Sequence, residues 1–143
     1  MDDFWPKEYS DLAAEMDRRA VQERTILVTQ DGEPVGFIGI ARLSPILGTL
    51  RGVCFTKDVH GNGTAMRAVR AALQQEFDAD VHKIMAWPFA DNGRSIAFYK
   101  KLGAVEEGLL KGQTLRDGKL TDILLLAFFA SEDGYGYRNK EIS

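Results

Sequence analysis

A glycine-rich segment, Gly61-Asn62-Gly63, carries the strongest chemical signal in this 143-residue chain. It lies between an apolar run that ends at Thr56 and an amphipathic run that begins at Ala65. If the second run is a helix, its first turn presents unpaired N–H groups and the positive end of the helix dipole to the segment. The glycines remove Cβ atoms that would keep an oxygen ligand away from these amides. The pattern therefore predicts an anion site of the kind that holds phosphate groups.

Other phosphate-binding loops fit this segment poorly. A dinucleotide-binding fingerprint needs a third glycine or an alanine where the chain has Met66, and a Walker A loop needs a Gly-Lys-Ser/Thr sequence that the chain lacks. An isolated Gly-x-Gly is most often a flexible turn, but its position between a strand and a helix favours a phosphate site here. Four basic residues near it in the sequence add positive charge: Arg51, Lys57, Arg67 and Arg70.

The elements that must position this segment follow from residue periodicity. We expect helices over residues 6–20, 65–77 and 94–102, and strands over residues 24–30, 34–43, 49–56, 83–87, 105–115 and 120–129. Asp31-Gly32 and Asp117-Gly118 are hairpin signals, and Gly48 belongs to a longer turn. Asp91 and Asn92 are candidate N-caps of the last helix. This order predicts a single mixed α/β domain over residues 1–130, followed by a polar tail over residues 131–143.

Composition and charge exclude several classes of protein. Hydrophobic residues make up 45% and charged residues 27%, which is ordinary for a globular domain and argues against a largely disordered chain. The net charge of −3 argues against a nucleic-acid-coating protein. Cys54, the single cysteine, allows no internal disulfide, and its apolar run suggests a buried thiol. With only two histidines, His60 and His82, we expect no metal site.

The chain also shows no sign of a membrane or secretory segment. Its N-terminus has no basic stretch followed by an apolar one, and its longest apolar run, residues 123–130, is too short to cross a bilayer. We therefore expect a cytoplasmic protein with no membrane partner.

Two motifs resemble the GNAT acyltransferase superfamily. Residues 60–65, His-Gly-Asn-Gly-Thr-Ala, are similar to its acetyl-CoA loop, commonly Gln/Arg-x-x-Gly-x-Gly/Ala. His60, Gly63 and Ala65 occupy the three defined positions, and His60 departs from the usual residue. Residues 92–104 are similar to the family element Asn-x-x-Ser/Ala-Ile-x-x-Tyr-x-Lys-x-Gly-Phe, with Ala104 in place of the last aromatic. The whole resemblance covers residues 24–129, and its last part looks like the ribosomal-protein and polyamine acetyltransferases.

This resemblance implies a mostly antiparallel central sheet with helices on both faces, and acetyl-CoA as co-substrate without a metal. It implies an amine acceptor on a protein or a small molecule, and cofactor contacts from residues of two segments and one cap: Val53, Cys54, Phe55, His60, Gly61, Asn62, Gly63, Thr64, Ala65 and Asn92. The same resemblance makes Tyr99 the general acid beside the sulfur. Without that motif, the residues alone favour Tyr99 as a core aromatic with a satisfied hydroxyl, and Asn92 could be only a helix cap.

The sequence departs from the family pattern at its front. Only one helix is expected before the strand at residues 24–30, so the opening strand of the fold is missing. An uncovered sheet edge invites pairing with another chain, and we expect a homodimer through it. No acid lies in residues 49–56, where the family often places its general base, which leaves Asp122, His82, Glu33, Glu107 or a water chain. A GNAT-fold binding module without catalysis is the second hypothesis.

Overall fold

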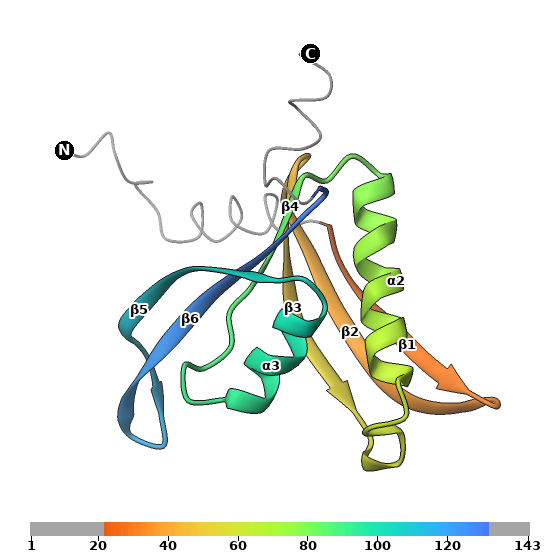
Figure 1. Cartoon of the computed structure of the whole chain (residues 1–143), viewed down its shortest axis with the longest axis horizontal. Helices are drawn as coiled ribbons and strands as arrows, with labels where there is room; N and C mark the ends of the chain where they lie inside the picture. The colour runs from red at the N-terminus through yellow and green to blue at the C-terminus, as the bar shows by residue number, and fades with distance from the viewer. Residues whose placement is uncertain (1–21, 132–143) are drawn as a thin grey trace, which may run out of the picture.

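The structure is a computed structural model that describes residues 22–131. Its elements, in chain order, are β1 (Gln22–Gln30), β2 (Glu33–Ser44), β3 (Leu47–Phe55), a short 3-10 turn η1 (Lys57–Val59), α2 (Thr64–Asp78), β4 (Lys83–Ala86), α3 (Gly93–Lys101), β5 (Val105–Arg116) and β6 (Lys119–Phe129). The strands form one sheet in the order β1-β2-β3-β4-β6-β5 (Figure 1). The expected mixed α/β architecture is confirmed. The helix expected over residues 6–20, the missing opening strand, and the tail from residue 132 lie outside the described residues.

Local turn signals place the hairpins where they were expected. Asp31 and Gly32 have φ of 53° and 82°, and Asp117 and Gly118 have φ of 52° and 76°, as a two-residue hairpin turn requires. The turn between β2 and β3 is shorter than expected, because the strands already pair at Ser44 and Leu47. Gly48 therefore lies inside β3 and not in the turn.

The sheet opens between its two central strands. β3 and β4 are its one parallel pair within residues 22–131, and their register covers only Leu47–Thr49 opposite Lys83–Met85. β3 continues to Phe55 with β2 on one side, whereas β4 ends at Ala86. A bulge between Gly39 and Ile40 of β2, opposite the extra residue Arg51 of β3, bends this half of the sheet further. The C-terminal half of β3 is left with one strand neighbour.

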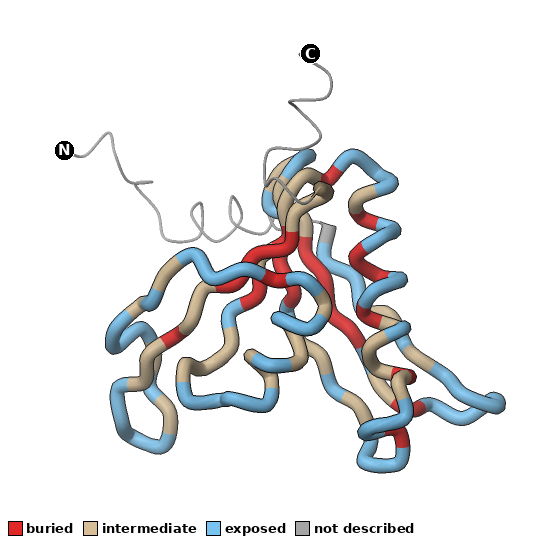
Figure 2. Tube along the Cα trace, viewed as in Figure 1, coloured by how far each residue is buried: buried red, intermediate tan, exposed pale blue. Residues whose placement is uncertain are grey.

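One apolar core joins both described helices to the sheet. Val69 and Leu73 of α2 pack with Ile38 of β2 and Ile84 of β4, and Phe98 of α3 packs against the same cluster. Figure 2 shows the buried residues concentrated where the central strands meet α2. The helical spacing read from the sequence thus gives α2 its buried face.

Glu76 fixes the C-terminal end of α2 to the sheet. Its side chain is 2% exposed and accepts from Arg24 of β1 and Arg42 of β2, each at 2.8 Å. A buried carboxylate is tolerated only when paired in this way, so the two arginines and the glutamate specify how α2 lies across β1 and β2.

We expect Glu76→Gln to lower the free energy of unfolding by about 1–3 kcal/mol, because a neutral amide cannot satisfy both guanidinium groups. Urea denaturation at pH 7 measures the change. Glu23→Gln is the matched control, since Glu23 is exposed and lies 4.0 Å from Arg51. It should change stability by no more than about 0.5 kcal/mol. Equal effects of the two substitutions would contradict the anchoring role of Glu76.

Candidate functional site

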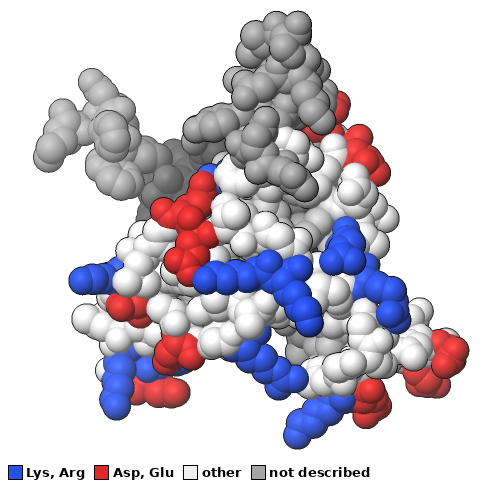
Figure 3. All heavy atoms as spheres, viewed as in Figure 1, with Lys and Arg blue, Asp and Glu red and all other residues white. Residues whose placement is uncertain are grey.

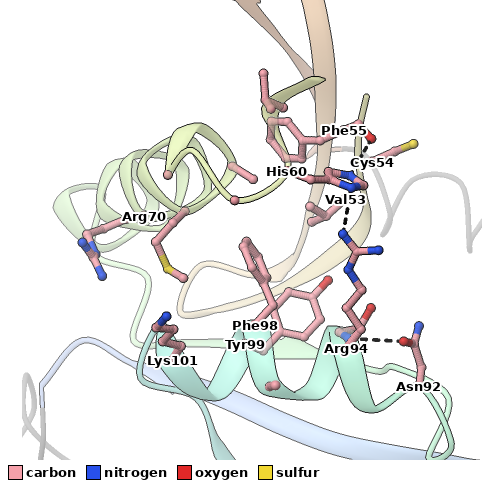
Figure 4. Close-up of a pocket in the computed structure, with 17 residues that line it drawn as sticks. Val53, Cys54, Phe55, His60, Arg70, Asn92, Arg94, Phe98, Tyr99 and Lys101 are labelled. Carbon is pink, nitrogen blue, oxygen red and sulfur yellow. Dashed lines mark hydrogen bonds between the residues drawn. The ribbon is translucent and has the colours of Figure 1, made fainter. Parts of the chain in front are cut away.

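A groove of about 930 Å³ lies where the sheet opens, between β3, the start of α2 and α3 (Figure 4). The predicted general acid, Tyr99, lines it together with most residues predicted as cofactor contacts, which come from elements far apart in the sequence: Val53, Cys54, Phe55, His60, Gly61, Gly63, Ala65 and Asn92. The structure thus brings the two motifs to opposite walls of one groove. Asn62 and Thr64 do not line it.

The glycine-rich segment forms a cradle of main-chain donors at the start of α2. Gly61 and Gly63 have φ of 83° and 84°, a conformation that side-chain-bearing residues rarely adopt. Gly63 is the N-cap, and the Thr64 N–H is already satisfied by Asn62 Oδ1 at 2.9 Å. The N–H groups of Ala65 and Met66 have no acceptor within residues 22–131. These two are free for a ligand oxygen.

Main-chain groups of β3 that have no strand partner in the described sheet form a second set of donors and acceptors. The Thr56 N–H donates to a β2 carbonyl over 2.8 Å, so Thr56 is a hydrogen-bonded position of the antiparallel ladder. Such positions alternate, so Cys54 also bonds to β2, while Val53 and Phe55 direct their N–H and C=O groups away from it. The bond between His60 Nε2 and Phe55 O agrees with this direction. Both residues therefore face the groove.

Tyr99 lines the groove from α3 while its ring belongs to the core. The ring packs edge-on against Phe98 and Phe128, with centroids 5.6 and 6.1 Å away. Its hydroxyl points between the groove walls in Figure 4 and has no hydrogen-bond partner among the described residues. Burial raises the pKa of this phenol above its ordinary value. Tyr99 thus presents a hydroxyl proton that has no acceptor among residues 22–131.

Asn92 holds the start of α3. Its Oδ1 accepts from the Ser95 N–H at 3.2 Å, so Asn92 is the N-cap, and the other candidate, Asp91, is not. The preceding loop is fastened to β6, where Ala90 N–H donates to Asp122 O over 2.9 Å. Capping uses only the oxygen of the Asn92 amide, so its NH₂ group remains available on the groove side.

Cys54 is exposed, which corrects the expectation of a buried thiol. An apolar run does not show which of its residues face the core, and strand alternation places Cys54 opposite Val53 and Phe55. Figure 4 shows its sulfur directed away from Tyr99. Cys54 therefore lines the groove without presenting a nucleophile to Tyr99.

Basic residues mark the rim of the groove. Arg70, Arg94 and Lys101 line it, and sequence reasoning gave no role to Arg94 or Lys101. Figure 3 shows lysine and arginine side chains gathered over α2 and α3 on this face. A signal was present for Lys101, which occupies the lysine position of the family-like element at residues 92–104. The groove is therefore suited to an anionic ligand.

No carboxylate lines the groove in the described part of the chain. None of the residues considered as general bases lines the groove, and two of them are already paired. Asp122 accepts from the Gly112 N–H at 2.7 Å, and Glu107 pairs with Lys83 at 2.6 Å. Neither Glu33 nor His82 lines the groove. Within residues 22–131 there is also no cluster of potential metal ligands, and no helix there could cross a membrane.

We expect Tyr99 to titrate above pH 10, because burial disfavours the phenolate. The measurement is the phenolate absorbance of wild type and of Tyr99→Phe as pH rises. The difference between the two curves isolates Tyr99 from the other tyrosines, of which the chain has four in all. A difference titration with a midpoint at or below 10 would show that the hydroxyl is not shielded from water.

Comparisons with known proteins agree with this geometry. Residues 1–104 match the model of the acetyltransferase (GNAT) family. The spermidine N-acetyltransferase from Vibrio cholerae, solved in complex with CoA and spermine, has a TM-score of 0.71 at 21% identity, covering 90% of this chain and 79% of that chain. The ribosomal-protein-alanine N-acetyltransferase from Brucella melitensis has a TM-score of 0.67 at 21% identity, covering 84% and 76%. A search of curated proteins found no match. By its family match, the chain belongs to the acetyltransferase (GNAT) family.

Proposed function

We propose that this protein is an N-acetyltransferase that moves an acetyl group from acetyl-CoA to a primary amine of a protein or a small molecule. One observation carries the proposal: the free amides of α2, the unpaired edge of β3 and the unpartnered hydroxyl of Tyr99 all meet in one groove. The family match supports it, as does the likeness to an enzyme crystallised with CoA and spermine.

Each part of acetyl-CoA has a chemical counterpart in the groove. The diphosphate suits the N–H groups at Gly61, Gly63 and Ala65, where the helix dipole favours negative charge. The pantetheine arm carries amide groups, which suit the N–H and C=O groups of Val53 and Phe55. An arm bound in this way would continue β3 on its open side, as an added strand does.

The reaction that we propose is direct attack of a neutral amine on the thioester carbonyl. The C–N bond forms and the C–S bond breaks, so the sulfur leaves as a thiolate. A β3 amide stabilises the oxyanion, and Tyr99 donates its proton to the sulfur. A phenol with a raised pKa holds this proton across the neutral range. The amine loses its own proton to water, because no carboxylate lines the groove in the described residues.

The lack of a carboxylate among the described residues of the groove also favours a second candidate, a CoA-binding module that has lost catalysis. Such a module would bind CoA in the same groove. It would release no free CoA from acetyl-CoA when amines are added. Turnover separates the two candidates, whereas binding does not.

We expect acetyl-CoA to raise the melting temperature, since a ligand at 100 times its Kd stabilises the native state by about 2.7 kcal/mol. A screen of polyamines and peptide N-termini, with free CoA thiol as readout, should then reveal turnover. Tyr99→Phe should bind acetyl-CoA normally and lose roughly 100-fold or more in kcat. A Tyr99→Phe enzyme as fast as wild type, with chemistry rate-limiting, would rule out the proton-donor role.

We also propose that the chain self-associates through the open edge of β1. In the described sheet β1 has β2 as its one neighbour, and Leu27 and Phe37, directly opposite in the two strands, are 65% and 44% exposed. Light scattering after size-exclusion chromatography should give twice the chain mass of 15.9 kDa. Leu27→Lys should return it to one chain mass, while a monomeric wild type would refute the proposal.

A further inference from the structure

A side-chain bridge crosses the groove from one wall to the other. Arg94, at the start of α3, donates from Nη2 to His60 Nδ1 over 2.7 Å. His60 lies in the loop before α2, and its Nε2 is 3.2 Å from Phe55 O. Figure 4 shows this chain of contacts closing one side of the groove beside Tyr99. The bridge therefore lies where both helices begin.

The donors and acceptors of the bridge are fixed by chemistry. An arginine guanidinium can only donate, so His60 Nδ1 must accept with its lone pair. A backbone carbonyl can only accept, so His60 Nε2 must carry the proton that reaches Phe55. His60 is thus a neutral imidazole in one defined tautomer, directed by its two neighbours.

Arg94 is a cation in an unfavourable place. It is the second residue of α3, where the positive end of the helix dipole disfavours a positive charge. Its one hydrogen-bond partner in the described structure is a neutral ring and not a carboxylate. Such a bond is weaker than one to an anion.

The two helix starts also lack the acids that usually occupy them. Neither α2 nor α3 has an acidic residue in its first turn, although acids are favourable there. The positive ends of both helices and Arg94 therefore share one region, and within residues 22–131 the nearest acid before α3, Asp91, is already paired with Arg116. A bound anion would compensate their positive charge.

We propose that Arg94 binds the diphosphate of CoA. In the free protein His60 holds the Arg94 guanidinium across the groove, and the bound diphosphate replaces His60 as its partner. This inference rests on the proposed function. His60 stands where the family loop commonly has glutamine or arginine, so the cation here would come from α3. The exchange replaces a bond to a neutral ring with charge-assisted bonds to phosphate oxygens.

The test measures Kd for CoA and for pantetheine, which lacks the diphosphate, by NMR titration of four proteins: wild type, Arg94→Ala, Arg94→Lys and Lys111→Ala. Lys111 is an exposed cation on β5 outside the groove, so its variant controls for the loss of one charge. Arg94→Ala should bind CoA roughly 10- to 100-fold more weakly. Pantetheine should bind Arg94→Ala and wild type with the same Kd. The Kd of Arg94→Lys for CoA should lie between those of wild type and Arg94→Ala, and the Kd of Lys111→Ala should equal that of wild type.

The ring nitrogens of His60 give an independent readout. Their ¹⁵N shifts should show an Nε2-protonated ring in the free protein, and the Nδ1 signal should move when CoA displaces Arg94. In Arg94→Ala the free protein should already show the moved signal. CoA affinity that is unchanged or increased in a folded Arg94→Ala protein would overturn the inference and leave the proposed function standing. A wild type that binds no CoA would instead overturn the proposed function itself.

Discussion

The groove depends on the early end of the β3–β4 pairing. A parallel ladder of three residue pairs is enough to hold the two strands in one sheet, and beyond it each strand follows a different neighbour. Main-chain groups of Val53 and Phe55 then face open space, although backbone polar groups need partners. Water and the His60 ring can satisfy them in the free protein. A ligand with its own amides can replace that water, so the opening suits the pantetheine arm that we propose for it.

The helices complete the site because the core fixes them at one end and leaves the other free. Glu76 and Leu73 hold the later turns of α2 against the sheet. Its first turn, with Ala65 and Met66, extends to the groove with N–H groups unpaired within the described structure. Stability and the proposed binding therefore depend on different turns of one helix. Substitutions near Glu76 should act on folding, and those near Gly63 on binding.

Structural features that depend on residues adjacent in the sequence could be predicted from it, whereas features that depend on contacts between distant parts of the chain could not. The Asp-Gly hairpins, the Asn92 cap and the glycine cradle depend on a few consecutive residues, and their geometry agrees with the expectation. The exposure of Cys54 depends on which face of β3 meets the core, and an apolar run does not show this. The bond between Arg94 and His60 joins residues 34 positions apart, so spacing could not predict it.

A core position of the Tyr99 ring and the proposed chemical role of its hydroxyl are compatible in this structure. Phe98 and Phe128 hold the ring edge-on, so the direction of its hydroxyl is set by packing. The same burial raises the pKa of the phenol and keeps its proton in place. A looser ring would lie in water, with an ordinary pKa and a hydroxyl bonded to solvent. Packing is therefore the means by which this chain can present a proton donor to the groove.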